Sequence, residues 1–416
     1  MLGDRLRPCL ACGRLLLLVF AVASCGGVVA CAEPPPRELI IHAGLLLDGT
    51  GAAPRERQRL RVEDGVLMAI EDDTQGVEPA SATRMVVDAR DATVVPGFID
   101  LGHSYFPEAA CGLGERSLDN AVGSSLLSLA AGITSALAVD TQDVPLVALQ
   151  RFVGVGRHRG PRLFPMGQGI EIRAPSAGTP VYPKSRVLPG GDVNAAAAAV
   201  ADDVALGAAV LRVAVGPLDT RADEAEKTLC AALEAARRHD LRTLVLVEDD
   251  AGLVAAARCR AHAVWSNDSE APSEAGLRLA RDNDVTLVMH PTSHGLPLVV
   301  ASGARLGIAT GLTTCDAPRL RLEATLARMH ERGVPAARIV TAATLGGAYA
   351  LGRGDALGRI AVGHRGDLVV IEGDPLSEPA ALTRVRQVIV EGVVQRPDLT
   401  RRSVAALWAW LEVLVD

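Results

Sequence analysis

The sequence predicts an α/β protein in which a large region of alternating strands and helices lies between two shorter β-rich regions at the chain ends. Three observations lead to this prediction. From Pro96 onward, apolar strand-like runs alternate with helical stretches, which is typical of a parallel α/β barrel or a doubly wound sheet. Before Pro96 and again near the C-terminus, strand-like runs follow one another. The 416 residues suffice for a barrel with an accessory domain.

The first 36 residues have the pattern of a targeting segment. Arg5, Arg7 and Arg14 precede the run Leu15–Ala32, which contains no charged residue. A short basic region followed by an apolar run and small residues is typical of a secretory signal. We therefore expect the protein to be exported to the cell envelope or periplasm.

The sequence allows three outcomes for this leader: lipidation, simple cleavage, or retention as a membrane anchor. The sequence ending at Cys25 resembles the lipobox of bacterial lipoproteins, and Cys31 ends a second match, so either cysteine is a candidate for lipidation. Cleavage after Ala32 would instead release a soluble exported protein. A retained membrane anchor is the third possibility, because the uncharged run has the minimum length of a span. Pro34–Pro36 would act as a stiff spacer before the folded part.

The sequence after the spacer predicts a series of strands. The expected strands are Leu39–Leu47, Gln58–Val62, Val66–Ile70, Met85–Val87 and Thr93–Val95. Turn sequences rich in Asp and Gly separate the first three of them.

The central region alternates between the two kinds of element. The expected helices are Leu118–Ala131, Val193–Leu206 and Ala222–Arg238, and the expected strands are Ile133–Val139, Val210–Val215, Leu244–Val247, Thr286–Met289 and Leu306–Ala309. This alternation indicates a parallel sheet.

Strands return toward the C-terminus at Asp367–Ile371 and Gln387–Val390. The last stretch, Ser403–Asp416, has leucines at helical spacing beside Trp408. We expect a helix that docks on the core, and a partner-binding helix is the alternative.

The composition excludes several classes of protein. With 49% hydrophobic and 22% charged residues, the chain is too apolar to be disordered. A net charge of −7 argues against a nonspecific nucleic-acid binder, and 3% aromatic residues leave few side chains for stacking on bases. We therefore expect no nucleic-acid partner.

Four cysteines lie in or near the leader, and the remaining four, Cys111, Cys230, Cys259 and Cys315, are widely spaced. An exported protein could pair them. Because no CxxC pattern occurs, we expect isolated buried thiols.

Several short motifs occur in an order that is similar to one known family. They are Leu39–Gly44, Asp48–Gly51, Val62–Gly65, Val94–Asp100, Ala130–Ser135, Gly160–Phe164, Ala342–Thr344, Ala350–Gly352, Leu357–Ile360, Gly363–Val370 and Gly373–Leu376. Together they span residues 38–395 and resemble the amidohydrolase superfamily, closest to its imidazolonepropionase-like branch.

The resemblance implies a (β/α)8 TIM barrel with a small composite β-sandwich built from both chain ends. The expected divisions are a leader and spacer at 1–36, the sandwich at 37–92 plus 362–396, the barrel at 93–361, and a C-terminal helix at 397–416. Members of this superfamily are hydrolases of non-peptide carbon–nitrogen bonds that use a metal, usually zinc, to activate water.

The first metal-ligand motif of the family is missing. Strand one of such a barrel normally ends in a His-x-His pair, but the matching positions here hold Gly102 and Ser104. His103 lies between them, and because strand side chains alternate, it is expected to point to the opposite face unless a bulge turns it. One histidine cannot replace two ligands, so His103 is only a weak candidate.

The remaining ligand positions are also changed. Arg212 stands where some members carry a carboxylated lysine, and a guanidinium offers no lone pair to a metal. Glu248 lies at the position of the strand-five histidine and Asp268 at that of the strand-six histidine. On strand eight, Thr313 replaces the usual aspartate, unless a three-residue insertion brings Asp316 into its place.

Two hypotheses follow. The first is a metal-free, catalytically impaired homologue (a pseudoenzyme) that needs no cofactor and uses the barrel for binding or assembly. The second is an active hydrolase of cyclic amides or related substrates, in which Asp316 and Glu248 would be catalytic and Asp268 would help to hold a divalent metal. A plugged apolar barrel mouth would favour the first, and a polar cluster would favour the second. A small-molecule ligand is expected in either case, and a lipid anchor would tether the protein to a membrane.

Overall fold

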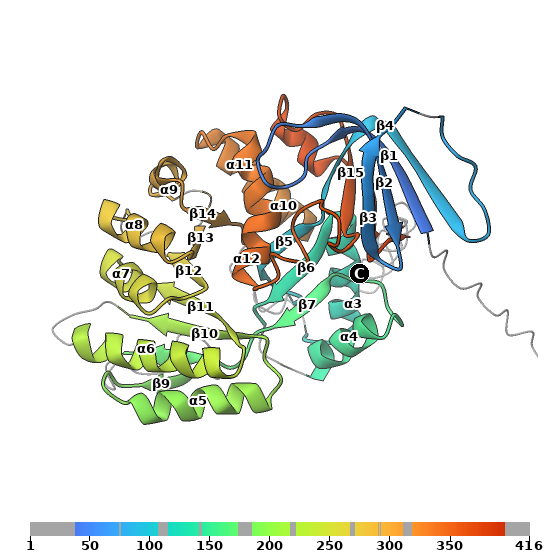
Figure 1. Ribbon diagram of the computed structural model, residues 1–416. Coiled ribbons are helices and arrows are strands. Elements are labelled where there is room, and N and C mark those ends of the chain that lie inside the picture. The colour runs from blue at the N-terminus through green and yellow to red at the C-terminus, as the bar shows by residue number, and fades with distance from the viewer. Residues whose placement is uncertain are drawn as a thin grey trace, which may run out of the picture. The chain divides into compact units, whose positions relative to one another are not determined.

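The computed structural model describes residues 38–74, 76–106, 115–140, 144–173, 185–216, 222–266, 271–289, 291, 293–310 and 318–395 (Figure 1). The leader with Cys25 and Cys31, the C-terminal segment 397–416, and both Cys111 and Cys315 lie outside these ranges. Within the ranges, every helix is too short or too polar to cross a lipid bilayer.

Both ends of the chain contribute to one seven-stranded sheet, in which the first strands lie beside the last ones (Figure 1). Its order is β17-β16-β15-β4-β1-β2-β3. The strands are β1 (Glu38–Leu46), β2 (Arg55–Glu63), β3 (Val66–Asp72), β4 (Arg84–Pro96), β15 (Leu368–Glu372), β16 (Val385–Val390) and β17 (Val393–Gln395).

The two expected strands Met85–Val87 and Thr93–Val95 form the single strand β4. The charged residues between them, Asp88, Arg90 and Asp91, are exposed on one continuous strand and do not interrupt it. One face of the sheet encloses its own apolar core, which includes Ile41 of β1 and Val370 of β15. The other face packs on the core of the large domain through Val369.

The large domain repeats a strand–helix unit. Its strands are β5 (Phe98–His103), β6 (Ile133–Ala138), β7 (Arg162–Pro165), β10 (Val210–Val215), β11 (Arg242–Val247), β12 (Ala263–Ser266), β13 (Thr286–Met289) and β14 (Arg305–Gly307). Its helices are α3 (Leu118–Ala130), α4 (Val144–Gly154), α5 (Val193–Ala205), α6 (Ala222–Arg238), α7 (Asp250–Arg258), α8 (Glu274–Asp282), α9 (Leu296–Ser302) and α10 (Pro318–Glu331). Two short strands, β8 (Ile170–Ile172) and β9 (Arg186–Leu188), extend the sheet beside β10.

Two links close the eight strands into a TIM barrel. Met166, directly after β7, forms a parallel bridge with Val210 of β10. On the other side, the Leu101 N–H of β5 donates to the carbonyl oxygen of Ile308, directly after β14, at 2.9 Å. The parallel sheets β5-β6-β7 and β10 to β14 thereby form one ring.

Asp100 of β5 strengthens the second link. Its carboxylate is fully buried and accepts four hydrogen bonds. The donors are the backbone N–H of Gly102 (3.0 Å), the backbone N–H of Thr310 (2.9 Å), the Thr310 hydroxyl (2.6 Å) and Nδ1 of His103 (2.8 Å). Burial acts to raise the pKa of this carboxyl, but the hydrogen bonds from His103 and Thr310 outweigh it, so the pKa lies below its usual value.

Side chains alternate between the barrel interior and the surrounding helices. On β10, Leu211 and Val213 belong to the core shared with α5 and α6, whereas Val210 belongs to the interior cluster with Leu244. Arg212 therefore faces the interior. The amino ends of the strands are covered by α11 (Ala336–Thr341), the π-helical turn η2 (Ala342–Gly346) and α12 (Gly347–Ala350), and a 3-10 turn, η3 (Pro379–Thr383), precedes β16.

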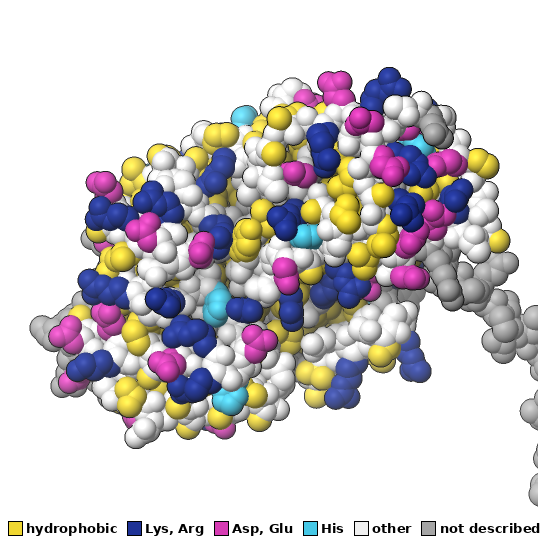
Figure 2. Space-filling model, in the orientation of Figure 1, with side chains coloured by type: hydrophobic (Ala, Val, Ile, Leu, Met, Phe, Trp, Pro, Cys, Tyr) yellow, Lys and Arg dark blue, Asp and Glu magenta, His cyan; other side chains and the backbone are white. Residues whose placement is uncertain are grey.

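The surface mixes both signs of charge. On the face drawn in Figure 2, basic and acidic side chains are interspersed. Over the described surface, charged side chains form short-range exposed pairs, such as Arg90 with Asp88 and Arg238 with Glu234. Exposed pairs of this kind contribute little to stability, so the fold depends mainly on its cores.

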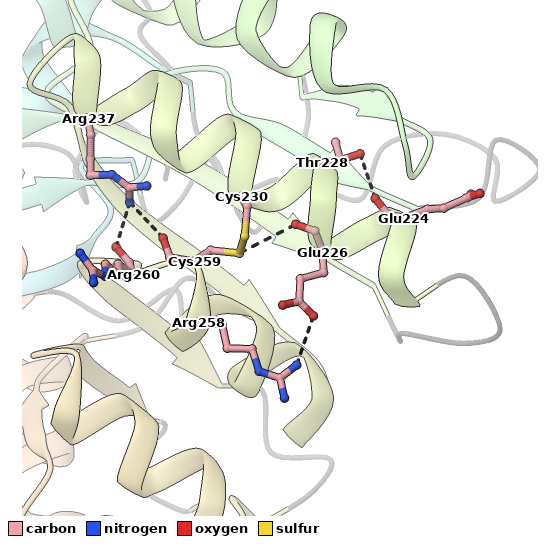
Figure 3. Close-up of a disulfide and its surroundings, with 8 residues drawn as sticks. All are labelled: Glu224, Glu226, Thr228, Cys230, Arg237, Arg258, Cys259 and Arg260. Carbon is pink, nitrogen blue, oxygen red and sulfur yellow. Dashed lines mark hydrogen bonds and ion pairs between the residues drawn. A yellow bond between two sulfur atoms is a disulfide. The ribbon is translucent and has the colours of Figure 1, made fainter.

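The expectation of isolated thiols is wrong for one pair, because Cys230 and Cys259 form a disulfide (Figure 3). Cys230 lies on α6, and Cys259 directly follows α7, which is the next helix around the barrel. Near the bridge, Arg237 donates to the carbonyl oxygen of Cys259 at 3.0 Å, and Arg258 pairs with Glu226 at 3.5 Å. The spacing of the two cysteines along the chain gave no sign that the fold brings their Cα atoms to 4.8 Å.

Replacing Cys230 and Cys259 together by serine should lower the free energy of unfolding by about 3 kcal/mol, because the bridge restricts the unfolded chain. Chemical denaturation of the oxidised protein measures this difference. Reductant should destabilise the wild type by a similar amount and leave the double variant unchanged. A wild type as stable with reductant as without it would contradict the prediction.

Asp100→Asn should lower the free energy of unfolding at neutral pH by about 3 kcal/mol or more, because an amide nitrogen would face two donors in a buried site. Since the folded pKa of Asp100 is depressed, its contribution is present above about pH 4 and is lost as the pH falls further. The variant should therefore lose less stability than the wild type on acidification. Asp240→Asn, at a position whose side chain is 89% exposed, is the matched control and should change stability little.

Candidate functional site

The carboxyl ends of the barrel strands form the mouth, where the candidate residues from the sequence were expected. Among the described residues, the inward-facing side chains at this level form a largely apolar cluster. Its members are Val139, Met166, Leu246, Trp265, Val288 and Ala309. Arg212 on β10 and Glu171 on β8 are charged residues of these strands, and both are buried.

Trp265 occupies the interior next to Gly102. It lies on β12, which is separated from β5 by β13 and β14, so the indole reaches across the barrel. A Cβ atom added at Gly102 would lie 2.7 Å from the Ala309 Cβ and 2.9 Å from the indole ring. Real Cβ atoms do not approach other atoms this closely, so no larger side chain fits at position 102 without movement of its neighbours.

His103 points away from the mouth. The register of β5 against β6 shifts between Asp100 and His103, and the imidazole lies toward α3, fully buried. Its Nδ1 bonds to Asp100 at 2.8 Å, and its Nε2 lies 2.9 Å from the Ser128 hydroxyl. The structure thus places His103 among structural contacts and away from Gly102.

The order Asp100–His103–Ser128 has the connectivity of a hydrolytic triad but not its chemistry. The Ser128 hydroxyl donates its hydrogen to the carbonyl oxygen of Ser124 at 2.6 Å. The Ser128 hydrogen is therefore engaged with the backbone, whereas a nucleophilic serine donates to its histidine. All three residues are fully buried. This network is therefore structural.

Ser104 contributes to a second buried network at the edge of the mouth. Its hydroxyl donates to Asp140 at 3.2 Å, and Asp140 also accepts from the Tyr105 N–H at 2.6 Å. Arg116 lies 3.3 Å from the same carboxylate. Burial raises the pKa of Asp140 despite these contacts. Ser104 is therefore engaged in fixing the chain after β5.

Arg212 fixes the turn after β7. Its guanidinium donates to the carbonyl oxygen of Gln168 at 2.7 Å and to the Ser185 hydroxyl at 2.8 Å. From the other side, Asp203 accepts from the N–H groups of Gln168 (2.9 Å) and Gly169 (3.1 Å). Burial raises the pKa of Asp203. Gly102, Ser104 and Arg212 thus take part in three separate local structures.

Glu248 is exposed just after β11, and its neighbour Asp249 caps α7 by accepting from the Gly252 N–H at 2.7 Å. Asp268, Thr313 and Asp316 lie outside the described residues. Among the residues that are described, no three His, Cys, Asp or Glu side chains converge as a metal site would require. The described donors at the mouth therefore do not fit a zinc ion, which needs three or four such ligands.

Three residues of the site were not anticipated. Trp265 could have been found from the alternation on its strand, since it lies two positions after the interior residue Ala263. Asp140 directly follows the predicted strand Ile133–Val139, and residues at the carboxyl ends of barrel strands line the mouth. Glu171, 2% exposed and 3.4 Å from Arg173, lies on the short strand β8 that no pattern indicated.

Solved structures with this fold include several hydrolases. A Xaa-Pro dipeptidase with bound methionine aligns with a TM-score of 0.72 at 20% identity, covering 86% of this chain and 100% of that one. A molinate hydrolase aligns at 0.72 and 17% identity, covering 88% and 96%. An ochratoxinase from A. niger aligns at 0.68 and 15% identity, covering 87% and 97%. Identities this low establish the shared fold.

The sequence comparison finds a family likeness in the C-terminal half of the chain. Residues 217–394 match the model of the amidohydrolase family. No curated protein sequence matches the chain, and the imidazolonepropionase-like branch stays a prediction. The partial family match, together with the barrel and its two-ended sheet, makes this chain similar to amidohydrolases in its C-terminal half and in its fold.

Proposed function

We propose that this protein is a metal-free amidohydrolase homologue, impaired in hydrolysis, that uses its barrel for binding or assembly. The observation that carries this proposal is the packing of the Trp265 indole on Gly102 and Ala309. This packing leaves no space at position 102 for a metal-ligating side chain.

The chemistry of the replaced positions supports the same proposal. Gly102 offers no donor atom, and the Ser104 hydroxyl is engaged with Asp140. The Arg212 guanidinium is a permanent cation that repels a metal ion and donates hydrogen bonds. Zinc activates water only when a set of nitrogen, sulfur or oxygen ligands holds it at an open position.

We further propose that the protein is exported and carries a lipid on Cys25 or Cys31. The leader sequence motivates this assignment. The Cys230–Cys259 disulfide supports it, because disulfides persist mainly in oxidising compartments outside the cytosol. Mass spectrometry of the mature protein, which would show an acylated cysteine or an unmodified N-terminus, distinguishes a lipoprotein from a soluble exported protein.

The mature protein should hold well below one metal ion per chain after dialysis against zinc, manganese or iron and removal of the excess. Elemental analysis measures the content directly. A member of the same fold that hydrolyses its substrate with zinc serves as the loaded control. Near-stoichiometric metal in this protein would contradict the proposal and would favour the alternative hydrolase with Glu248, Asp268 and Asp316.

Gly102→Ala should lower the free energy of unfolding by about 1–3 kcal/mol, because the added methyl group meets Ala309 and the indole. In a Trp265→Leu background the same substitution should cost less, since a smaller side chain leaves space for it. Chemical denaturation of the four proteins gives the coupling energy. Fully additive effects would show that the indole does not fill the space beside Gly102.

A further inference from the structure

A cleft of about 220 Å³ opens at the amino ends of the barrel strands, at the opposite end from the mouth. Arg305 is the first residue of β14, and Val285 directly precedes β13, which fixes this location. The polar side chains that line the cleft are those of Arg281, Asp284, Arg305, Arg338, Thr341 and Tyr349.

Arg305 is held in a fixed orientation at this cleft. Its guanidinium donates to Asp284 twice, to the backbone carbonyl at 2.7 Å and to the carboxylate at 2.8 Å. Its Cζ lies 4.0 Å from the centre of the Tyr349 ring, as in a cation–π contact. Asp284 thus neutralises Arg305, so this pair contributes no net charge to the cleft.

The other two arginines give the cleft a positive charge. Arg281 lies 3.4 Å from Asp282, which is a loose and exposed contact. Arg338, on α11, donates to the carbonyl oxygen of Ala304 at 2.8 Å, and no described carboxylate forms an ion pair with it. The Arg338 guanidinium, which lines the cleft, therefore has no carboxylate as a counter-charge among the described residues.

We propose that this cleft binds a small oxyanion, namely the carboxylate or phosphate group of an acidic small molecule. A guanidinium presents its N–H groups in a planar fork that matches the oxygen atoms of either group. The volume equals that of roughly seven water molecules, at about 30 Å³ each, which suits such a group with a short attached body. The cleft is separate from the mouth and does not depend on the function proposed for it.

Binding would affect the amino end of the barrel. The cleft is also lined by Leu345 and Gly346 of η2, and by Tyr349 of α12. These segments cover the strand ends, so an anion that bridges Arg338 and Arg281 would join α11 to α8. A ligand that binds only the folded state also raises its stability.

The test is a calorimetric titration of the full mature protein with inorganic phosphate and, separately, with succinate, at constant ionic strength maintained with sodium chloride. We expect saturable one-to-one binding of at least one probe. Phosphate alone would identify a phosphoryl group as the ligand chemistry, and succinate alone would identify a carboxylate. Absence of saturable binding for both would overturn the proposal.

Variants locate the binding. Arg338→Gln should weaken the affinity by about tenfold or more, and Arg338→Lys, which keeps the charge but not the fork, should restore part of it. Arg332→Gln, at an exposed position just after α10, is the matched control and should bind as the wild type does. Equal affinities for the Arg338→Gln and Arg332→Gln variants would overturn the assignment to this cleft, and thermal unfolding without ligand verifies that both variants fold.

Discussion

The buried carboxylate of Asp100 is the interaction on which the barrel mouth depends. Through Thr310 it joins the first barrel strand to the chain that follows the last one. Through His103 it also fixes the direction of the imidazole, toward α3 and away from the interior. Because a buried charge is tolerated only when fully hydrogen-bonded, this network determines the position of β5 and everything that faces the mouth from it.

The rest of the mouth follows from that position. With His103 turned outward, Gly102 borders the interior near the end of β5, and the indole of Trp265 fills the space beside it. Ser104 and Arg212 hold neighbouring turns through hydrogen bonds to Asp140 and Gln168. Gly102, Ser104 and Arg212 thus contribute to the local structure of the mouth.

Local patterns predicted most of the fold. Helix Ala222–Arg238 and strand Thr286–Met289 occur with the expected bounds, because their periodicity depends on neighbouring residues alone. The outward direction of His103 agrees with the expectation, but a register shift in β5 sets it, since Leu101 of the same strand faces the interior. The Cys230–Cys259 bridge and the packing of Trp265 on Gly102 were not predicted, because each joins residues from different elements and depends on the closed barrel. Asp268 and Asp316 lie outside the described residues, so their predicted roles stay untested.

The close fit between Gly102 and Trp265 has an evolutionary consequence. An imidazole introduced at position 102 would collide with the indole, and loss of the indole alone would leave a cavity in the barrel. Either single change is therefore costly, while the two changes together cost much less. Because each residue constrains the other, descendants of this chain are expected to retain or to change positions 102 and 265 together.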